Sequence, residues 1–262
     1  MQPLLTLFLA SGLALLVLFT VTWLIQLRTG NAAIVDAVWS ASFPLMAGIY
    51  FLKVEEHAIR HYLILIAVVV WGMRLAIYLL IRTLGHTEDV RYTTLRKEWG
   101  NKQHLLMLRF YYFQALLALI LSLPFALIML NTSSPELNGI EIIGGIVWLM
   151  AVIGESTADQ QLKKFKSDPA NKGKICDVGL WYYSRHPNYF FEWMIWIAFF
   201  IMALGSQWGY ITIICPAFML YFLLKVTGIP YTEMQMVKSK GQPFIEYQKT
   251  TSAFVPLPKR KK

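Results

Sequence analysis

The sequence predicts an all-α integral membrane protein with about seven transmembrane helices, on the strength of three observations. Hydrophobic residues make up 56% of the 262-residue chain and charged residues only 15%, whereas soluble domains have about 25% charged residues. The apolar stretches are long and continuous rather than short and alternating, which argues against a transmembrane β-barrel. The basic residues gather in alternate loops, as the positive-inside rule describes.

Each predicted span is an apolar stretch of about 20 residues, the length that crosses the hydrocarbon core. The stretches lie at roughly 3–27, 33–52, 62–82, 110–130, 140–160, 188–205 and 208–227. The first has no basic leader and no small-residue cleavage site, so we interpret it as a span rather than a signal peptide. The second fits least well, because it contains Asp36 and because Pro44 is expected to break the helix.

The distribution of basic residues tests the number of spans. Loops 82–109 and 161–187 each hold six Lys and Arg, and the chain from residue 225 onward holds eight. Seven spans put these segments on one side, with the N-terminus outside and the C-terminus cytoplasmic, whereas six or eight would scatter them. We therefore expect a multi-pass membrane protein, in the inner membrane if the chain is bacterial, whose basic tail from Lys259 attracts anionic lipid head groups.

Two classes of function are not expected from the composition. Nucleic-acid binding is a poor interpretation of the net charge of +9, because the basic residues lie in loops between spans. Cys176 and Cys215 belong to no CxxC motif or Cys/His cluster, so neither a metal site nor a disulfide is indicated. Without linkers, repeats or low-complexity tracts, residues 1–262 are predicted to form a single membrane domain.

Residues 180–192, LWYYSRHPNYFFE, are the most informative stretch. Pro187 suits the first position of a helix, and Asn188 and Glu192 then share one helix face. Ionisable groups at the start of a span are usually retained for function, and a helix N-terminus suits a phosphate group. The alternative is a helix cap combined with a membrane-interface anchor.

A second group of charged residues lies in the fifth span. Glu155, Asp159 and Lys163 recur every four residues, and Lys166 follows three residues later, so they share one helix face. A solvated helix end explains the lysines but not the acids, which need partners such as Arg185, His186 or a ligand. After the last span, Gly228 and Pro230 end the helix. Tyr231 and Glu233 follow at the interface, where each is also explained as an anchor.

The N-terminal half carries dispersed polar groups among apolar ones. They are Asp36 and Trp39 in the second span, Arg74 and Tyr78 in the third, and Tyr111 and Tyr112 in the fourth. This composition is typical of an apolar cavity with a few orienting groups, although hydrogen bonds between helices, such as Asp36 with Arg74, would also explain it. We predict a substrate-cavity half in residues 1–130 and a half for a phosphate-bearing cofactor in residues 140–258.

Several motifs together resemble the membrane steroid 5α-reductase superfamily, and in particular its bacterial branch. They are GLWYYSRHPNYFFEW, the upstream acids Glu155 and Asp159, and the downstream TGIPYTE and TSAFVPLP, with VDAVWS, WGMRLAIYLLIR and EDVRYTTLR in the first half. The resemblance is best from about residue 140 to 258.

The resemblance implies that the C-terminal half binds NADPH. Asp159, Asn188, Glu192 and Tyr231 would contact the cofactor, and Glu155 stands where eukaryotic members tend to carry Asn. The basic residues of the 161–187 loop would neutralise the pyrophosphate and the 2′-phosphate. The predicted cofactor-binding residues are Glu155, Asp159, Lys163, Lys166, Lys174, Arg185, His186, Asn188, Glu192, Tyr231 and Glu233, together with Lys172.

The implied reaction is reduction of a 3-oxo-Δ4 steroid, with hydride to C5 and a proton to C4. Charge develops on the 3-oxygen, so catalysis needs a hydrogen-bond donor there, and a carboxyl kept protonated in a dry pocket can supply it. Eukaryotic members use a Gln-Glu pair and a Tyr, whereas this chain has Trp71 at the Tyr position and no matching Glu. We predict Asp36 as the polarising acid with Tyr112 as a helper. Trp39, Trp71 and Tyr78 would line the substrate pocket of a monomer surrounded by membrane lipid.

Two other classes of protein were weighed. RHPNYFFE also resembles the RHPxY…E signature of membrane methyltransferases that act on isoprenylcysteine or phospholipid head groups with S-adenosylmethionine. The lysine-rich loop favours the reductase, because S-adenosylmethionine carries no phosphate. A lipid or sterol binder without enzymatic activity would need no cationic cofactor surface.

Overall fold

The computed structural model describes residues 2–260, and its regular structure is helical apart from an isolated bridge between Ser184 and Ser252. Six helices in this range are long and apolar enough to cross a membrane, namely Gln2–Thr29, Ile34–Leu52, Ile59–Thr83, Val90–Met129, Gly139–Ser167 and Gly209–Lys240. Pro187–Ala203 is a shorter apolar helix of 17 residues. The chain is therefore an all-helical, multi-pass membrane protein, as predicted.

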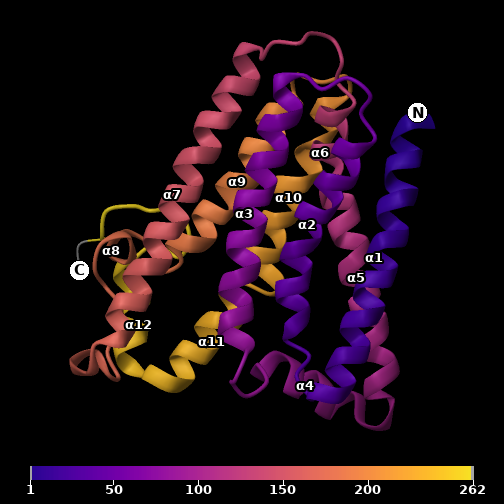
Figure 1. The fold of residues 1–262 in the computed structure, drawn as a ribbon. Helices are drawn as coiled ribbons and strands as arrows, with labels where there is room; N and C mark the ends of the chain where they lie inside the picture. Colours follow the sequence, from indigo (N-terminus) through magenta and orange to yellow (C-terminus); the bar gives the residue numbers. More distant parts are fainter. Residues whose placement is uncertain (1, 261–262) are drawn as a thin grey trace. The chain divides into compact units, whose positions relative to one another are not determined.

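The chain divides into two compact units. The first runs to Asn138 and includes Gly205–Gly209, and the second comprises Gly139–Leu204 and the chain from Tyr210 onward. The first contains α1 (Gln2–Thr29), α2 (Ile34–Leu52), α3 (Ile59–Thr83), α4 (Val90–Trp99), η1 (Gly100–Lys102), α5 (Gln103–Leu121) and α6 (Leu123–Met129) (Figure 1). The boundary lies beside the predicted division between residues 130 and 140, and the assignment of a substrate half and a cofactor half stays a prediction.

The buried side of α1 shows why an almost uniformly apolar helix packs in one orientation. Leu7, Ser11, Leu15 and Phe19 are buried at every fourth position, whereas Leu9 is 65% exposed. Residues four apart lie on one helix face. That face packs within the first unit, and the exposed leucines are suited to lipid.

The predicted break at Pro44 does not occur, because α2 continues through this residue. Pro44 lies against Gly72 of α3, where an added Cβ would be only 2.6 Å from the proline Cδ. A residue without a side chain therefore makes room for the ring where the two helices are in contact. The predicted fourth span is instead divided into α5 and α6 at Ser122, whose Oγ lies 2.7 Å from the Tyr50 hydroxyl.

The second unit contains the motifs that the sequence singled out. Its elements are α7 (Gly139–Ser167), η2 (Pro169–Asn171), α8 (Leu180–Tyr183), α9 (Pro187–Ala203), η3 (Gly209–Ile213), α10 (Ile214–Tyr221), η4 (Phe222–Val226), α11 (Ile229–Lys240) and α12 (Gln242–Thr250). Helix α10 continues into the π-helical turn η4 and ends before Gly228. A Cβ on Gly228 would lie 2.5 Å from the Leu223 carbonyl oxygen. The glycine thus permits the sharp turn into α11.

After α12, residues 251–260 form a non-helical segment that we call the C-terminal strap (Figure 1, yellow). Phe254 of the strap is buried with Leu223 and Ile229, and Phe190 and Trp193 of α9 pack against this cluster. The strap therefore belongs to the folded body of the second unit and closes over the start of α9.

Candidate cofactor site

Helices α7 and α9 lie side by side, and two glycines allow their close approach (Figure 1). A Cβ on Gly144 would lie 2.4 Å from Met202 Cγ, and one on Gly154 would lie 2.4 Å from the Phe191 ring. Small residues at a helix interface let the backbones come close together in a membrane. Gly154 is followed directly by Glu155 and, one turn later, by Asp159.

The acids that the sequence singled out on α7 and α9 are buried. Glu155, Asp159 and Glu192 are 3%, 9% and 8% exposed. The Asn188 amide donates to Asp159 Oδ1 at 3.3 Å, and the Trp196 indole donates to Glu192 Oε1 at 3.1 Å. The structure thus brings Asp159 of α7 together with Asn188 of α9, a pair 29 residues apart in the chain.

Hydrogen bonds from residues at and beside α8 fix the loop between α7 and α9 to α7. The Trp181 indole donates to the Ala158 carbonyl at 2.9 Å, and the Leu180 amide donates to Gln161 Oε1 at 2.9 Å. Gly179 adopts a φ of +58° beside Gln161 and leaves no room for a side chain. Gln161 was not among the predicted site residues. The signal that could have found it is its polar side chain, two residues after Asp159.

Glu233 of α11 is the centre of a second cluster. Its Oε1 accepts from Arg185 Nε at 2.6 Å and lies 3.2 Å from His186 Nε2, and its Oε2 accepts from Gln248 at 2.7 Å. The side chains of Arg185 and Glu233 are only 10% and 14% exposed. Arg185 also donates to the carbonyl of Gln248 at 2.9 Å. The guanidinium predicted to bind phosphate is therefore held by protein acceptors in this structure.

His186 immediately precedes α9 and is buried. Its ring stacks on Tyr189 at 5.3 Å between centroids. Burial lowers the pKa of His186 below its usual value of 6.5, and this outweighs the opposite effect of its hydrogen bond with Glu233. The imidazole is therefore neutral at pH 7 and orients α9 without adding a charge.

The C-terminal strap fixes the backbone of the same loop. The Arg185 amide donates to the Ser252 carbonyl at 2.8 Å, and Ser184 Oγ donates to the Phe254 carbonyl at 2.7 Å. The hydroxyl of Tyr247 in α12 donates to the Trp181 carbonyl. Together these contacts fix the backbone just before and within the RHPN turn.

The lysines predicted to bind phosphate form a solvated group. Lys163, Lys166, Lys172 and Lys174 are all exposed, at the end of α7 and in the loop that follows. They supply positive potential at the solvent-exposed surface. Tyr231, which the sequence grouped with them, is half-buried on α11.

Asp36 lies in an environment different from the predicted dry pocket. Its Oδ2 pairs with Arg91 Nη2 at 2.8 Å, and its Oδ1 accepts from the Tyr92 hydroxyl at 2.6 Å. Both partners belong to α4, the short helix between α3 and α5. A carboxylate between a guanidinium and a phenol accepts hydrogen bonds, whereas the predicted catalytic role requires it to donate one.

The other residues predicted for catalysis and substrate binding lie on different elements of the first unit. Tyr112 of α5 lies 2.9 Å from the Thr20 hydroxyl of α1. Trp39 packs edge-on against Phe43, and its indole nitrogen is buried without a hydrogen-bond partner among the described residues. Trp71 is fully buried beside Phe43, whereas Tyr78 is 37% exposed. Asp36 therefore contacts α4, whereas Tyr112 contacts α1.

The segment 82–109, which the sequence marks by its basic charge and by the motif EDVRYTTLR, contains a network of ion pairs and hydrogen bonds. Arg96 Nε pairs with Glu88 Oε2 at 2.9 Å, and its Nη2 donates to Gln26 at 2.8 Å. Glu88 also accepts from the Ala32 amide at 2.7 Å. The readable signal was Asp89, a typical N-cap residue, which here accepts from the Arg91 amide.

Comparisons with known proteins identify one family. A family model described as "Protein of unknown function (DUF1295)" matches residues 22–251. A search of curated proteins and a search of solved structures found no match. The matched range includes α7, α9 and Glu233, and it ends at Thr251.

Proposed function

We propose that this chain, which belongs to the DUF1295 family of membrane steroid 5α-reductase-like proteins, is an NADPH-dependent reductase of 3-oxo-Δ4 steroids in the membrane. The observation that carries the proposal is the hydrogen bond between the buried Asp159 of α7 and the half-buried Asn188, which lies in the first turn of α9 directly after the RHP motif. These residues belong to the motifs on which the resemblance to the steroid 5α-reductases, including their bacterial branch, was based.

The residues of the second unit fit a phosphate-bearing dinucleotide. The first turn of α9 offers backbone N–H groups, which suit anions. Asn188 and Asp159 offer an amide and a carboxylate, which suit carboxamide and ribose hydroxyl groups. The exposed lysines 163, 166, 172 and 174 would neutralise phosphates. Arg185 could contact a phosphate only by giving up its ion pair with Glu233. In this proposal Arg185 and His186 therefore orient the RHPN turn.

NADPH would supply the hydride that adds to C5 of the enone. The electron pair of the C4–C5 double bond moves toward the 3-oxygen, and C4 then takes a proton. The chain must stabilise the oxygen and exclude water, tasks that the proposal gives to the first unit, with Trp39, Trp71 and Tyr78 as pocket residues. The polarising role of Asp36 is not carried into the proposal, because its carboxylate is paired with Arg91. Tyr112 remains the proposed donor.

A membrane methyltransferase using S-adenosylmethionine is the second candidate, and one observation favours it. The buried charged side chains of α7 and α9 are carboxylates, and three of them, Glu155, Asp159 and Glu192, are residues that the sequence singled out. Carboxylates suit the cationic sulfonium and ammonium groups of S-adenosylmethionine, whereas the lysines that suit phosphate are exposed. Direct comparison of the two cofactors therefore decides between the proposals.

The test is calorimetric titration of the purified protein with NADPH and, separately, with S-adenosylmethionine. We expect NADPH to bind, and Asn188→Ala to weaken that binding by about tenfold, the value of one hydrogen bond to a charged group. Asn138→Ala, in the loop before α7, is the control. Binding of S-adenosylmethionine with none of NADPH would replace the reductase by the methyltransferase.

The membrane arrangement is part of the proposal. We propose seven spans, with α9 as the sixth, an outside N-terminus and a cytoplasmic C-terminus, in a monomer. The 17 residues of α9 extend about 26 Å at 1.5 Å per residue, close to the hydrocarbon thickness of about 30 Å. Thiol labelling of single cysteines placed at Ser133 and Lys172 from either side of sealed membrane vesicles tests this. The proposal requires opposite sides for the two positions.

A further inference from the structure

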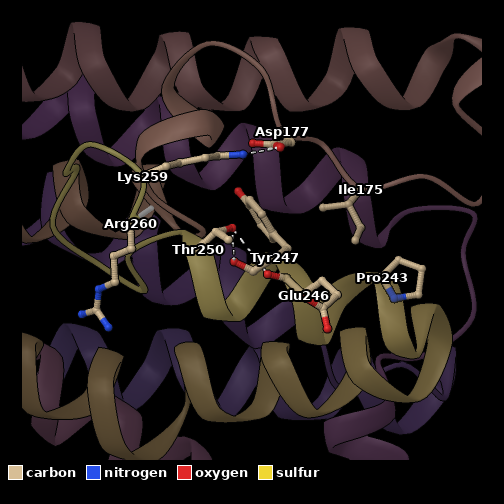
Figure 2. Close-up of a pocket in the computed structure, with 8 residues that line it drawn as sticks. All are labelled: Ile175, Asp177, Pro243, Glu246, Tyr247, Thr250, Lys259 and Arg260. Carbon is tan, nitrogen blue, oxygen red and sulfur yellow. Dashed lines mark hydrogen bonds and ion pairs between the residues drawn. The ribbon is translucent and has the colours of Figure 1, made fainter. Parts of the chain in front are cut away.

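A pocket lies between α12, the C-terminal strap and the loop before α8 (Figure 2). Its lining residues come from other segments of the chain than the turn that carries Asn188. Its volume is about 440 Å³, and Ile175, Asp177, Pro243, Tyr247, Lys259 and Arg260 are among the lining residues. Pockets of about 300–1,000 Å³ accommodate small ligands. The polar groups around it carry both signs of charge, which favours a ligand that also carries both.

One end of the pocket is built to hold an ammonium group, and Lys259 currently supplies it. Lys259 Nζ lies 2.5 Å from Asp177 Oδ2, a contact drawn in Figure 2. The same nitrogen lies 4.4 Å from the ring centroid of Tyr182 and 5.8 Å from that of Tyr247. Two aromatic rings and a carboxylate around one cation form a recurring recognition site for ammonium ligands. We call these three residues, Asp177, Tyr182 and Tyr247, the ammonium cage.

Lys259 can leave the cage without unfolding the strap. The backbone on either side of it is fixed, because the Leu257 amide donates to the Tyr183 carbonyl at 3.0 Å and the Arg260 amide donates to the Thr250 carbonyl at 2.9 Å. The ammonium itself is carried on a flexible four-carbon stem. Asp177 Oδ1 is buried and has no hydrogen-bond partner among the described residues, so the carboxylate can accept more than Lys259 gives it.

The surroundings of the cage point to a lipid as the source of the ammonium. Val178, Tyr183, Val255 and Leu257 are 52%, 45%, 45% and 51% exposed, and all four lie on the segments that carry the cage or the strap. Exposed tyrosines and aliphatic side chains together are typical of the membrane interface. Arg260 is exposed, and Figure 2 shows its side chain pointing away from Asp177, so its guanidinium is available to a phosphate.

We propose that this pocket binds the phosphate–ammonium head group of a membrane lipid, with the ammonium replacing Lys259 in the cage and Arg260 contacting the phosphate. Lys259 then acts as a tethered competitor that keeps the cage filled when no lipid is bound. The inference does not depend on the proposed reductase activity, because it uses none of the residues assigned to the cofactor.

The experiment uses the full chain in detergent and titrates it with short-chain phosphatidylethanolamine, with short-chain phosphatidylglycerol, which lacks the ammonium, and with free phosphoethanolamine. We expect the ethanolamine lipid to bind more tightly than the glycerol lipid. Lys259→Met should raise the affinity for the ethanolamine lipid about fivefold by removing the competitor, and Asp177→Asn or Tyr182→Leu should lower it by a similar factor. Lys238→Met, an exposed position on α11 that does not line the pocket, is the matched lysine control and should leave the affinity unchanged.

Three results would overturn the proposal. Equal affinity for the two lipids would remove the ammonium from recognition. An unchanged or lower affinity in Lys259→Met, at an unchanged melting temperature, would show that Lys259 does not compete for the cage. Free phosphoethanolamine binding as tightly as the lipid would assign the pocket to a soluble ligand. Because Asp177→Asn preserves the shape of the side chain, its melting temperature separates loss of binding from loss of folding.

Discussion

Replacing Glu233 with Gln tests the cluster that orients the start of α9. The change keeps the size of the side chain but removes the charge that Arg185 and His186 contact at 2.6 and 3.2 Å. Removing one partner of a buried ion pair costs about 3–5 kcal/mol. Here Arg185 keeps the carbonyl of Gln248 as an acceptor and the new amide oxygen accepts as well, so we expect roughly half of this, about 2 kcal/mol.

For a chain of this size, 1 kcal/mol shifts the melting temperature by about 2–4 °C. Glu233→Gln should therefore lower it by about 4–8 °C, measured by tryptophan fluorescence in detergent. The matched control is Glu246→Gln, since the Glu246–Lys249 pair has side chains 41% and 62% exposed and exposed pairs contribute about 0–1 kcal/mol. Adding Arg185→Met to Glu233→Gln should cost less than the sum of the two single changes. Equal melting temperatures for Glu233→Gln and Glu246→Gln would refute the reasoning.

Three further predictions concern pH, Asp36 and helix packing. Burial lowers the folded-state pKa of His186 below 6.5, so protonation of this residue favours unfolding. The stability of the protein should therefore be full above pH 6.5 and fall as the pH drops through the folded-state pKa. His186→Asn should show a smaller fall in melting temperature between pH 7 and 5. Asp36→Asn should lower the stability of the protein by about 1–3 kcal/mol, because it weakens the contacts with Arg91 and Tyr92, and it should leave the NADPH affinity unchanged. A changed NADPH affinity with unchanged stability would contradict this structural role of Asp36. Gly144→Ala should destabilise the protein by about 1–3 kcal/mol through overpacking against Met202. Gly48→Ala is the control, because no atom lies within 4 Å of its new Cβ, and it should not destabilise the protein. Equal melting temperatures for the two variants would contradict the close approach of α7 and α9.

The helical framework could be predicted because a lipid environment leaves few choices. A long apolar stretch must satisfy its backbone hydrogen bonds internally, so it forms a helix. The predicted second and third spans, 33–52 and 62–82, correspond to α2 and α3 within a few residues. The effect of Pro44 was predicted wrongly, because the neighbour that accommodates the ring, Gly72, lies on another helix.

The site was harder to predict, because its contacts join residues far apart in the chain. The spacing of Asp159 and of Asn188 indicated functional faces, but no local pattern shows that Arg185 pairs with Glu233, 48 residues later. Similarly, Arg60 reads as a charge in an outer loop, whereas it is 1% exposed and donates to the carbonyls of Asn131 and Glu136 at 3.3 and 2.7 Å. The local sequence pattern indicates on which helix face a residue lies, whereas its hydrogen-bond or ion-pair partner is seen only in the tertiary structure.

The most direct test of the proposed function is the fate of the transferred hydrogen. Membranes containing the protein would receive NADPH carrying deuterium at C4 of the nicotinamide, together with progesterone or testosterone, and the products would be analysed by mass spectrometry. Our account predicts a reduced steroid that carries deuterium at C5 and a solvent hydrogen at C4, formed at a much lower rate by Asn188→Ala. A steroid recovered unreduced in the presence of NADPH, together with transfer of a labelled methyl group from S-adenosylmethionine to a membrane lipid, would contradict it.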